Sequence, residues 1–261
     1  MLRPRVIPCL LIQDGGLVKT VKFKEPKYVG DPINAVKIFN EKEADELIVV
    51  DIDATVHGVE PNYKQIAKLA AECRMPLCYG GGVRTAEQAK RIIALGVEKV
   101  AISSAAIANP GLIAEIAEEI GRQSVVVVLD YKRRMLSKVC DVWTHNGTRN
   151  TKRNVLEVAQ ELEKLGAGEI VLNSIENDGR MKGYDVALAI ELRKAVRLPI
   201  TILGGGGSLD DMRSVVEACG VVGVAAGSFF VFKGSYRAVL ISYPTAQQKE
   251  EIIYSALRSD H

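Results

Sequence analysis

The stretch Ile48-Val49-Val50-Asp51 decides the fold, because it returns as Ile170-Val171-Leu172-Asn173 roughly 120 residues further along the chain. Each copy is a short, apolar run that ends in a polar residue, which is typical of a strand buried on both faces of a parallel sheet. Two more pairs keep this spacing: Tyr79-Gly80-Gly81-Gly82 returns as Leu203-Gly204-Gly205-Gly206, and Val100-Ala101-Ile102-Ser103-Ser104 returns as Val224-Ala225-Ala226-Gly227-Ser228. The chain therefore consists of two related halves, whose repeat is too long for a solenoid, where repeats run about 20–50 residues.

Short apolar runs alternate with amphipathic helical patterns along the whole chain. The strand candidates are Arg5–Leu11, Glu46–Asp53, Pro76–Tyr79, Lys99–Ser103, Ser124–Asp130, Glu169–Ser174, Pro199–Leu203 and Gly220–Ala226. The helical patterns are Pro32–Ala44, Asn62–Cys73, Ala86–Leu95, Asn109–Ile120, Lys152–Leu165, Ala187–Lys194, Asp210–Ala218 and Thr245–Leu257. Eight such units predict an α/β fold, a (β/α)8 TIM barrel built from two half-barrels. A doubly wound open sheet is the alternative, although it would not require this regularity.

No linker-like segment separates the units, so we expect residues 1–261 to form a single barrel domain. One insertion interrupts the pattern at about 133–149, where Val139, Asp141 and Trp143 alternate before Asn146-Gly147. An Asn-Gly pair after an alternating run is a hairpin signal. In a barrel this insertion follows the fifth strand, on the face that carries the chemistry.

The composition excludes several classes of protein. The 261 residues hold 34 Lys and Arg against 32 Asp and Glu, a formal charge of +2, so we expect no nucleic-acid or membrane partner. The N-terminus lacks the pattern of a signal peptide or a membrane span, which predicts a cytoplasmic protein. Five scattered cysteines without a CxxC pair indicate reduced thiols, and we expect neither a metal nor a cofactor.

The glycine runs predict phosphate binding, because each follows a strand and precedes a helix, where free backbone N–H groups accept an anion. A second strand end supplies a hydroxyl beside each run, as in the phosphate site after strands seven and eight of many barrels. Glycines that merely permit tight turns are the alternative for one run alone, but the duplication favours a substrate with a phosphate at each end. The candidate residues are Gly81, Gly82, Ser103, Ser104, Gly205, Gly206, Gly227 and Ser228.

Acidic residues stand at or beyond the carboxyl ends of several strands, among them Asp51, Asp130 and Asp178. Asp130 follows the run Val125-Val126-Val127-Val128-Leu129, so burial should raise its pKa toward a value useful for acid–base catalysis. A turn-capping role, or a pair with Lys132, is the alternative. Aligning the half-barrels places Leu11 opposite Asp130, and a leucine transfers no proton.

Charged residues also stand at the first positions of four strands: Arg5, Glu46, Lys99 and Glu169. Two cations and two anions at the opposite, N-terminal mouth predict a ring of ion pairs around the barrel axis. From chemistry alone, a stabilising plug is the simplest interpretation of this ring.

These features together resemble the cyclase subunit of imidazole glycerol phosphate synthase, the HisF family. The resemblance covers essentially the whole chain, and its specific pieces are Arg5-Val6-Ile7-Pro8-Cys9-Leu10, Gly30-Asp31-Pro32, Ala44-Asp45-Glu46-Leu47, Gly80-Gly81-Gly82-Val83-Arg84, Asp130-Tyr131-Lys132-Arg133, Leu165-Gly166-Ala167-Gly168-Glu169-Ile170, Asp178-Gly179 and Gly183-Tyr184-Asp185. It implies a barrel that receives ammonia from a class I glutaminase resembling HisH, docked at its N-terminal face. It also implies that the charged ring is an ammonia gate and that Lys19 belongs to the loop that covers the substrate.

The departures from the family pattern lie at the substrate face. The two catalytic carboxylates of the family fall at positions 11 and 130, and only Asp130 is present. Asn173 replaces a threonine, Ser103-Ser104 replaces an Asn-Thr pair, and Leu203 replaces a serine. Loss of one acid of such a pair should cost about 10²–10⁴ in rate.

This pattern is similar to divergent HisF paralogues encoded with surface-polysaccharide genes, in which ammonia passes to a separate ATP-dependent sugar amidotransferase. That resemblance implies conversion of an acetamido group of an amino sugar to an acetamidino group. Two other interpretations remain open. One is a true cyclase of histidine biosynthesis that uses Asp130 with a different acid, and the other is a subunit that activates the glutaminase without conducting ammonia.

Overall fold

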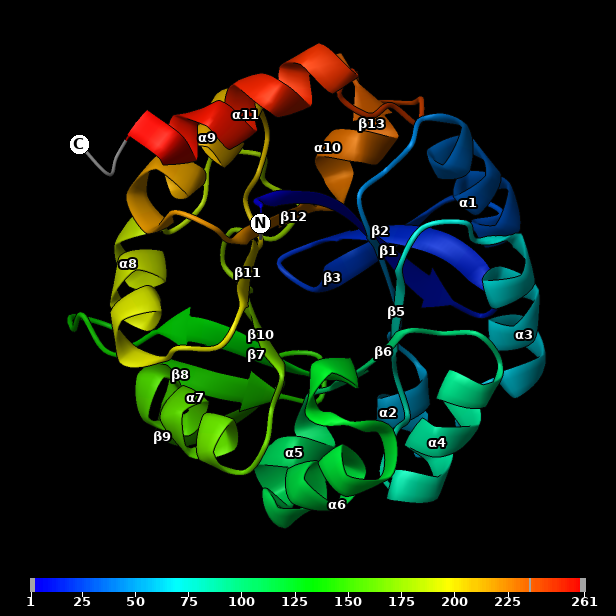
Figure 1. The fold of residues 1–261 in the computed structure, drawn as a ribbon, viewed down its shortest axis with the longest axis vertical. Helices are drawn as coiled ribbons and strands as arrows, with labels where there is room; N and C mark the ends of the chain where they lie inside the picture. The colour runs from blue at the N-terminus through cyan, green and yellow to red at the C-terminus, as the bar shows by residue number, and fades with distance from the viewer. Residues whose placement is uncertain (1–2, 235, 259–261) are drawn as a thin grey trace.

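Eight parallel strands form the centre of the computed structural model, which describes residues 3–234 and 236–258 (Figure 1). They are β1 (Arg5–Gln13), β4 (Leu47–Asp51), β5 (Leu77–Gly80), β6 (Lys99–Ile102), β7 (Val125–Arg133), β10 (Glu169–Ser174), β11 (Ile200–Leu203) and β12 (Gly223–Ala226). Each pairs in parallel with the next, and β12 pairs with β1, where Arg5 lies opposite Gly223. The sheet is therefore closed, which confirms the TIM barrel and excludes the open sheet.

Helices surround the barrel, as Figure 1 shows in a view toward its N-terminal mouth. The longer ones are α1 (Pro32–Glu41), α3 (Tyr63–Glu72), α4 (Ala86–Ala94), α6 (Gly111–Ile120), α7 (Val155–Lys164), α8 (Val186–Ala195), α9 (Leu209–Cys219) and α11 (Ala246–Arg258). Several begin at a side chain that caps the first turn: Asp31, Asn62 and Thr85 each accept a hydrogen bond from the backbone N–H three residues on. These caps explain why the helices begin where the strand-end loops finish.

Four short helical segments were not expected from the sequence: α2 (Ala54–His57), α5 (Ser104–Ala108), η1 (Arg122–Ser124) and α10 (Ser228–Val231). Each spans five residues or fewer, too short for a helical periodicity to be recognised. Three of them follow a barrel strand directly, at the mouth formed by the carboxyl ends of the strands. The expected helix over Asn109–Ile120 begins two residues later, at Gly111.

Two antiparallel hairpins extend the barrel at the same mouth. The first, β2 (Gly16–Val21) and β3 (Lys24–Gly30), continues β1 and was not expected. The second, β8 (Cys140–Thr144) and β9 (Arg149–Asn154), continues β7 and lies where the insertion at 133–149 was expected. It reaches Asn154, so the helix expected from Lys152 begins at Val155 instead. A small ribbon of β13 (Phe232–Lys233) and β14 (Ala238–Val239) precedes α11.

The extent of the domain over 1–261 stays a prediction, since residues 1, 2, 235 and 259–261 lie outside the described residues.

The apolar core has two parts. A large cluster fills the space between strands and helices, and a smaller one fills the barrel interior. The interior cluster consists of Ile7, Cys9, Ile48, Cys78, Ala101, Val126, Val171 and Ala225. It separates the two mouths of the barrel, each of which carries polar groups.

Candidate functional site

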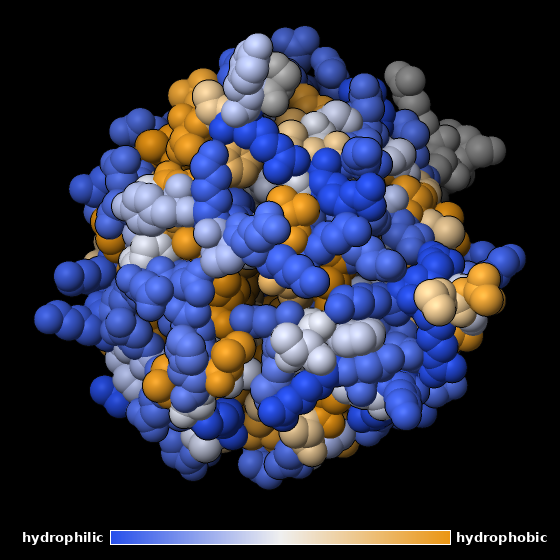
Figure 2. Space-filling model, turned by 180° about the vertical axis from the view of Figure 1, so that it is seen from behind, coloured by the Kyte–Doolittle hydropathy of each residue, from blue (hydrophilic) through white to orange (hydrophobic). Residues whose placement is uncertain are grey.

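A cavity of about 320 Å³ opens at the mouth formed by the carboxyl ends of the strands. Figure 2 looks into this mouth and shows a central hollow whose depth is apolar and whose rim is polar. Residues from every barrel strand or the loop that follows it line the cavity. All the residues predicted for the substrate face and the phosphate sites are among them: Lys19, Asp51, Gly81, Gly82, Ser103, Ser104, Asp130, Asn173, Asp178, Gly205, Gly206, Gly227 and Ser228.

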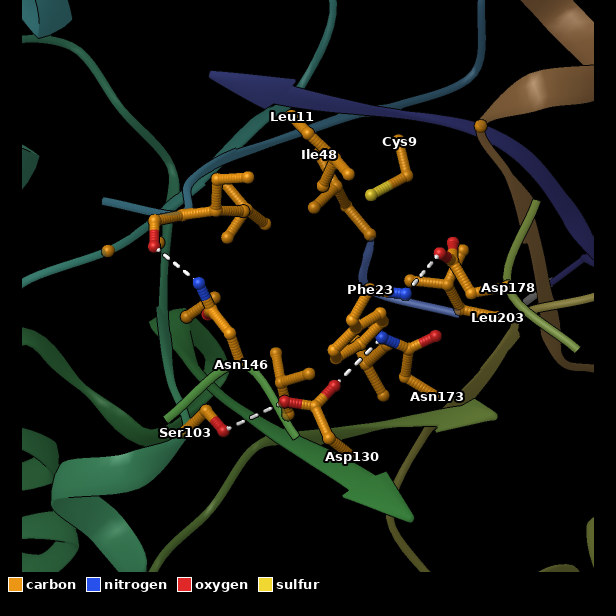
Figure 3. A pocket seen from close by; sticks show the side chains of 18 of the residues that line it. Cys9, Leu11, Phe23, Ile48, Ser103, Asp130, Asn146, Asn173, Asp178 and Leu203 are labelled. Carbon is orange, nitrogen blue, oxygen red and sulfur yellow. Dashed lines mark hydrogen bonds between the residues drawn. The ribbon is translucent and has the colours of Figure 1, made fainter. Parts of the chain in front are cut away.

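Asp130 is held in place by two neighbours. Asn173 Nδ2 donates a hydrogen bond to Oδ1 at 2.8 Å, and Ser103 Oγ donates to Oδ2 at 3.4 Å (Figure 3). Burial raises the pKa of Asp130 to about 7, against the lowering effect of these two donors. The carboxyl group can therefore exchange a proton near neutral pH, as the sequence predicted from its apolar surroundings.

Leu11 lies on the opposite wall of the cavity from Asp130 (Figure 3). It belongs to a group of four half-buried apolar residues that pack on the interior cluster, and all four line the cavity: Leu11, Val50, Val128 and Leu203. These side chains neither donate nor accept a hydrogen bond. The part of the cavity next to the interior cluster is therefore lined by apolar side chains, and the carboxylate of Asp130 lies beside them.

The first hairpin folds over this cavity and is fastened there by Asp178. The carboxylate of Asp178 accepts hydrogen bonds from Thr20 Oγ1 at 2.7 Å and from the backbone N–H of Phe23 at 3.1 Å. Its backbone carbonyl accepts from the N–H of Lys22 at 3.1 Å. Burial raises the pKa of Asp178, and the Thr20 and Phe23 donors oppose that rise. Phe23 is thereby placed on the cavity wall, a position that sequence reasoning did not assign.

Lys19 points inward from the same hairpin and is almost fully buried. Its Nζ donates to the carbonyl of Cys9 at 2.6 Å, and burial lowers its pKa. A Cβ atom added at Gly227 would come within 2.7 Å of this Nζ. The lysine is therefore packed against Gly227, one of the residues predicted to bind phosphate, and its positive charge would favour an anion there.

The first glycine run turns sharply at the end of β5. Gly81 has a φ of +120°, and a Cβ atom there would lie 2.4 Å from the carbonyl oxygen of Asp51. The carboxylate of Asp51 accepts hydrogen bonds from the backbone N–H groups of Asp53 and Ala54 at 3.0 and 3.1 Å. It therefore binds the backbone at the start of α2. Burial raises its pKa. Close packing thus requires glycine at 81, whether or not a phosphate binds.

The second glycine run is packed in the same manner. Gly205 has a φ of +114°, and a Cβ atom would lie 2.1 Å from the carbonyl oxygen of Gly183. At Gly206 a Cβ atom would lie 2.2 Å from the hydroxyl of Tyr184. The phosphate sites predicted at both runs stay predictions, since backbone packing alone accounts for these glycines.

The second hairpin contributes two more residues to the cavity, His145 and Asn146. The backbone N–H of His145 donates to Ser104 Oγ at 3.0 Å, and Asn146 Nδ2 donates to the carbonyl of Ile52 at 2.8 Å. Both residues have a positive φ, 52° and 54°. The Asn146-Gly147 turn was the sequence signal for this hairpin, but its contacts with Ser104 and Ile52 were not predictable from it.

The opposite mouth carries the charged ring. Arg5 forms ion pairs with Glu46 and, at 2.8 Å, with Glu169, and Lys99 pairs with these same two acids at 2.7 and 2.8 Å. Thr201 Oγ1 donates to Glu169 at 2.6 Å. Burial would raise the pKa of Glu169, but Arg5 and Lys99 outweigh it and lower that pKa to about 2. The four residues predicted at strand beginnings thus meet in one closed network.

The described residues contain no group of three or more His, Cys, Asp or Glu side chains that could hold a metal ion. Within these same residues, no helix is long and apolar enough to cross a bilayer.

Comparison with known proteins identifies the family. The model of the family described as histidine biosynthesis protein matches residues 5–237. A Vibrio vulnificus protein, provisionally named imidazole glycerol phosphate synthase subunit hisF3, is 56% identical over 253 residues, 97% of each chain. The chain belongs to the HisF family. A Leptospira borgpetersenii relative, provisionally named as a HisF subunit, is 53% identical over 97% of this chain and 99% of its own length.

A third HisF relative, the imidazole glycerol phosphate synthase subunit HisF of Streptomyces coelicolor, is 42% identical over 228 residues, 87% of this chain and 90% of that protein. The similarity to the provisionally named proteins is thus higher than to this HisF subunit. In this HisF-family barrel the charged ring and the cavity lie at opposite mouths.

Proposed function

We propose that this HisF-family barrel is one subunit of a glutamine amidotransferase and that it conducts ammonia without forming an imidazole ring. A HisH-like class I glutaminase docks at the N-terminal mouth. Ammonia passes the charged ring and the apolar interior and leaves at the other mouth. There an ATP-dependent sugar amidotransferase uses it to convert an acetamido group of an amino sugar to an acetamidino group in surface-polysaccharide biosynthesis.

The observation that carries this proposal is Leu11 on the wall opposite Asp130. Ring closure in the family uses a carboxylate on each wall, whereas here the apolar side chains Leu11, Val50, Val128 and Leu203 line the cavity beside Asp130. The other two lining carboxylates, Asp51 and Asp178, already accept hydrogen bonds from protein donors. Neutral ammonia needs no ionic partner to cross the apolar surface, while ammonium would lose its hydration there. The two mouths thus fit transport better than ring formation.

The direct test is a cyclase assay on the purified barrel, given the histidine-pathway substrate and an ammonium salt. We expect no imidazole glycerol phosphate, and turnover at an ordinary enzymatic rate would refute the proposal. Leu11→Asp supplies the missing carboxylate and should create weak cyclase activity. Leu11→Asn, which has nearly the same volume and no charge, is the matched control and should create none.

The gate is tested through coupling, measured as amidated product formed per glutamine hydrolysed in the reconstituted complex. Lys99→Ala should lower this ratio, because it opens the ring and leaves Glu46 and Glu169 without one of their two partners. Thr201→Val removes only the hydroxyl that contacts Glu169, and serves as a milder variant that keeps all four charges. Unchanged coupling in both variants would count against a gate.

A true cyclase is the second candidate, because Asp178 also lines the cavity and its charge contributes to the raised pKa of Asp130. In that case Asp178 or Asp51 would replace the missing acid. Asp178→Asn would then abolish imidazole formation, while Leu11→Asp would add little.

The third candidate, a non-conducting activator, predicts that the barrel stimulates glutamine hydrolysis but that all released ammonia appears in bulk solvent.

A further inference from the structure

The two hairpins at the cavity mouth carry much of the positive charge of the chain. Residues 16–30 hold four lysines and one glutamate, and residues 133–154 hold six basic residues and one aspartate. Together they contain ten of the 34 basic residues but two of the 32 acidic ones, so the rest of the chain has a net negative charge. The mouth with the cavity is therefore strongly basic in a chain whose total charge is only +2.

Most of these cations lack a carboxylate partner. Arg133 pairs with Asp185, Arg134 with Asp141 and Arg153 with Glu161. In the part of the chain that the structure describes, no ion pair involves the exposed residues Lys22, Lys24, Lys27, Lys138, Arg149 and Lys152. Burial, and after it the charge of Lys24 in the first hairpin, lower the pKa of Lys132 at the end of β7, so these two cations repel one another. Such a surface is stabilised by an anionic partner.

The turn that joins β7 to β8, next to the second hairpin, carries an exposed apolar tip. Met135 and Leu136 are 92% and 103% exposed, and Lys138 follows them. In Figure 1 the turn that carries them projects outward past α8. The hairpin beneath the tip is firmly built, because β8 pairs with β7 over four residues and Arg134 bridges Asp141 and the carbonyl of Lys152. Two solvent-exposed apolar side chains on a well-paired, basic segment have the features of residues that anchor a protein interface.

We propose that the tip Met135-Leu136 and the unpaired cations of both hairpins form the docking surface for the protein that consumes the ammonia. This inference rests on the proposed function and adds the chemistry of the partner. The partner presents an acidic surface around a small apolar pocket that receives the tip. Charge attracts the two proteins and orients them, so that the cavity mouth faces the acceptor site, and burial of the tip slows dissociation.

The charge pattern favours a protein partner over a nucleic acid. The cations form two clusters along the chain, with exposed Met135 and Leu136 in one and exposed Tyr28 in the other. Contacts with a phosphate backbone would leave Met135 and Leu136 exposed to water, whereas a folded acidic partner can bury them. The position at the mouth opposite the gate also leaves the N-terminal face free for the glutaminase.

The experiment measures binding of the purified, full-length barrel to the purified sugar amidotransferase at several salt concentrations, by biolayer interferometry. The first variant is Met135→Ser/Leu136→Asn, because asparagine tolerates the positive φ of 60° at Leu136. The second is Lys138→Glu/Lys152→Glu. Its matched control, Lys64→Glu/Lys68→Glu, makes the same charge change on exposed lysines of α3, outside both hairpins and the turn with the apolar tip. Circular dichroism and thermal melting establish that each variant is folded.

The wild-type barrel should bind with an affinity that falls as salt rises. Each mouth variant should weaken binding about tenfold or more, and the control should stay within about twofold. All variants should activate the glutaminase normally, because its face is unchanged. In the full complex, glutamine-dependent amidation should fall at low subunit concentration and recover at high concentration.

Equal affinity of wild type and mouth variants would overturn the docking surface. Equal weakening by the α3 control would overturn it too, by showing a non-specific charge effect. Preferential binding of a duplex DNA probe by the wild-type hairpins at physiological salt would assign the surface to nucleic acid instead. If wild type binds the amidotransferase but no amidated product forms, the proposed function fails while the docking surface stands.

Discussion

A buried carboxyl group has a lowered pKa at one mouth of the barrel and a raised pKa at the other. At the N-terminal mouth two cations and two anions satisfy one another, and the pKa of Glu169 falls to about 2. At the other mouth Asp130 is buried with two neutral donors and no cation, and its pKa rises to about 7. Desolvation acts on both carboxyl groups, so the sign of the shift depends on whether a counter-charge is present. A closed charge network suits a gate, while an unpaired carboxyl suits proton exchange.

Removing one member of the network should have the largest effect. Lys99→Ala leaves Glu46 and Glu169 with Arg5 alone, which should lower the free energy of unfolding by about 3–5 kcal/mol. Urea unfolding measures this. Lys90→Ala, which breaks an exposed pair with Glu119, is the matched control and should change the free energy of unfolding far less, because solvent screens this pair. Similar losses in both variants would mean that burial does not distinguish the ring.

Asp130 should affect stability in a pH-dependent manner. Its folded-state pKa lies above the ordinary value of 3.8, so the folded protein keeps a proton that the unfolded chain loses. Stability should therefore decrease as pH rises from about 4 to 7, by up to ~4 kcal/mol, and change little above that range.

The variant Asp130→Asn should flatten this part of the pH profile, measured by thermal unfolding from pH 4 to 9. Glu169 predicts the opposite slope, because its depressed pKa makes stability fall as pH drops from about 4.5 to 2. An Asp130→Asn profile that matches wild type between pH 4 and 7 would contradict the raised pKa.

The smallest expected effect concerns the hairpin that covers the cavity. Asp178→Ala removes the acceptor for Thr20 and Phe23 and should cost about 1–2 kcal/mol locally. Hydrogen exchange of residues 16–30 should then accelerate while the barrel strands keep their protection. Glu176→Ala, two residues away and outside this contact, is the control. Unchanged exchange in Asp178→Ala would show that the hairpin is held by other contacts.

The sequence predicted the barrel well because its signals are local. Eight apolar runs separated by helical patterns leave few other arrangements, and the repeated halves fix the equivalence of the glycine runs. The hairpin of residues 16–30 was missed because its turn uses Lys22 and Phe23 at positive φ, 54° and 61°, instead of glycine or asparagine. The preceding turn between β1 and β2 does carry a signal, because Asp14-Gly15 adopts positive φ values of 48° and 76°, but the prediction did not use it.

The sequence by itself determined which side chains stand at each strand end, because alternation and register follow from the strand pattern. It thus placed Arg5 and Glu169 at one mouth and Asp130 and Leu11 at the other. Only the tertiary structure decided the state of these groups. Ion pairing, desolvation and the lid held by Asp178 depend on distances between residues far apart in the chain, and the electrostatic energy of a group depends on those distances and on the water excluded around it.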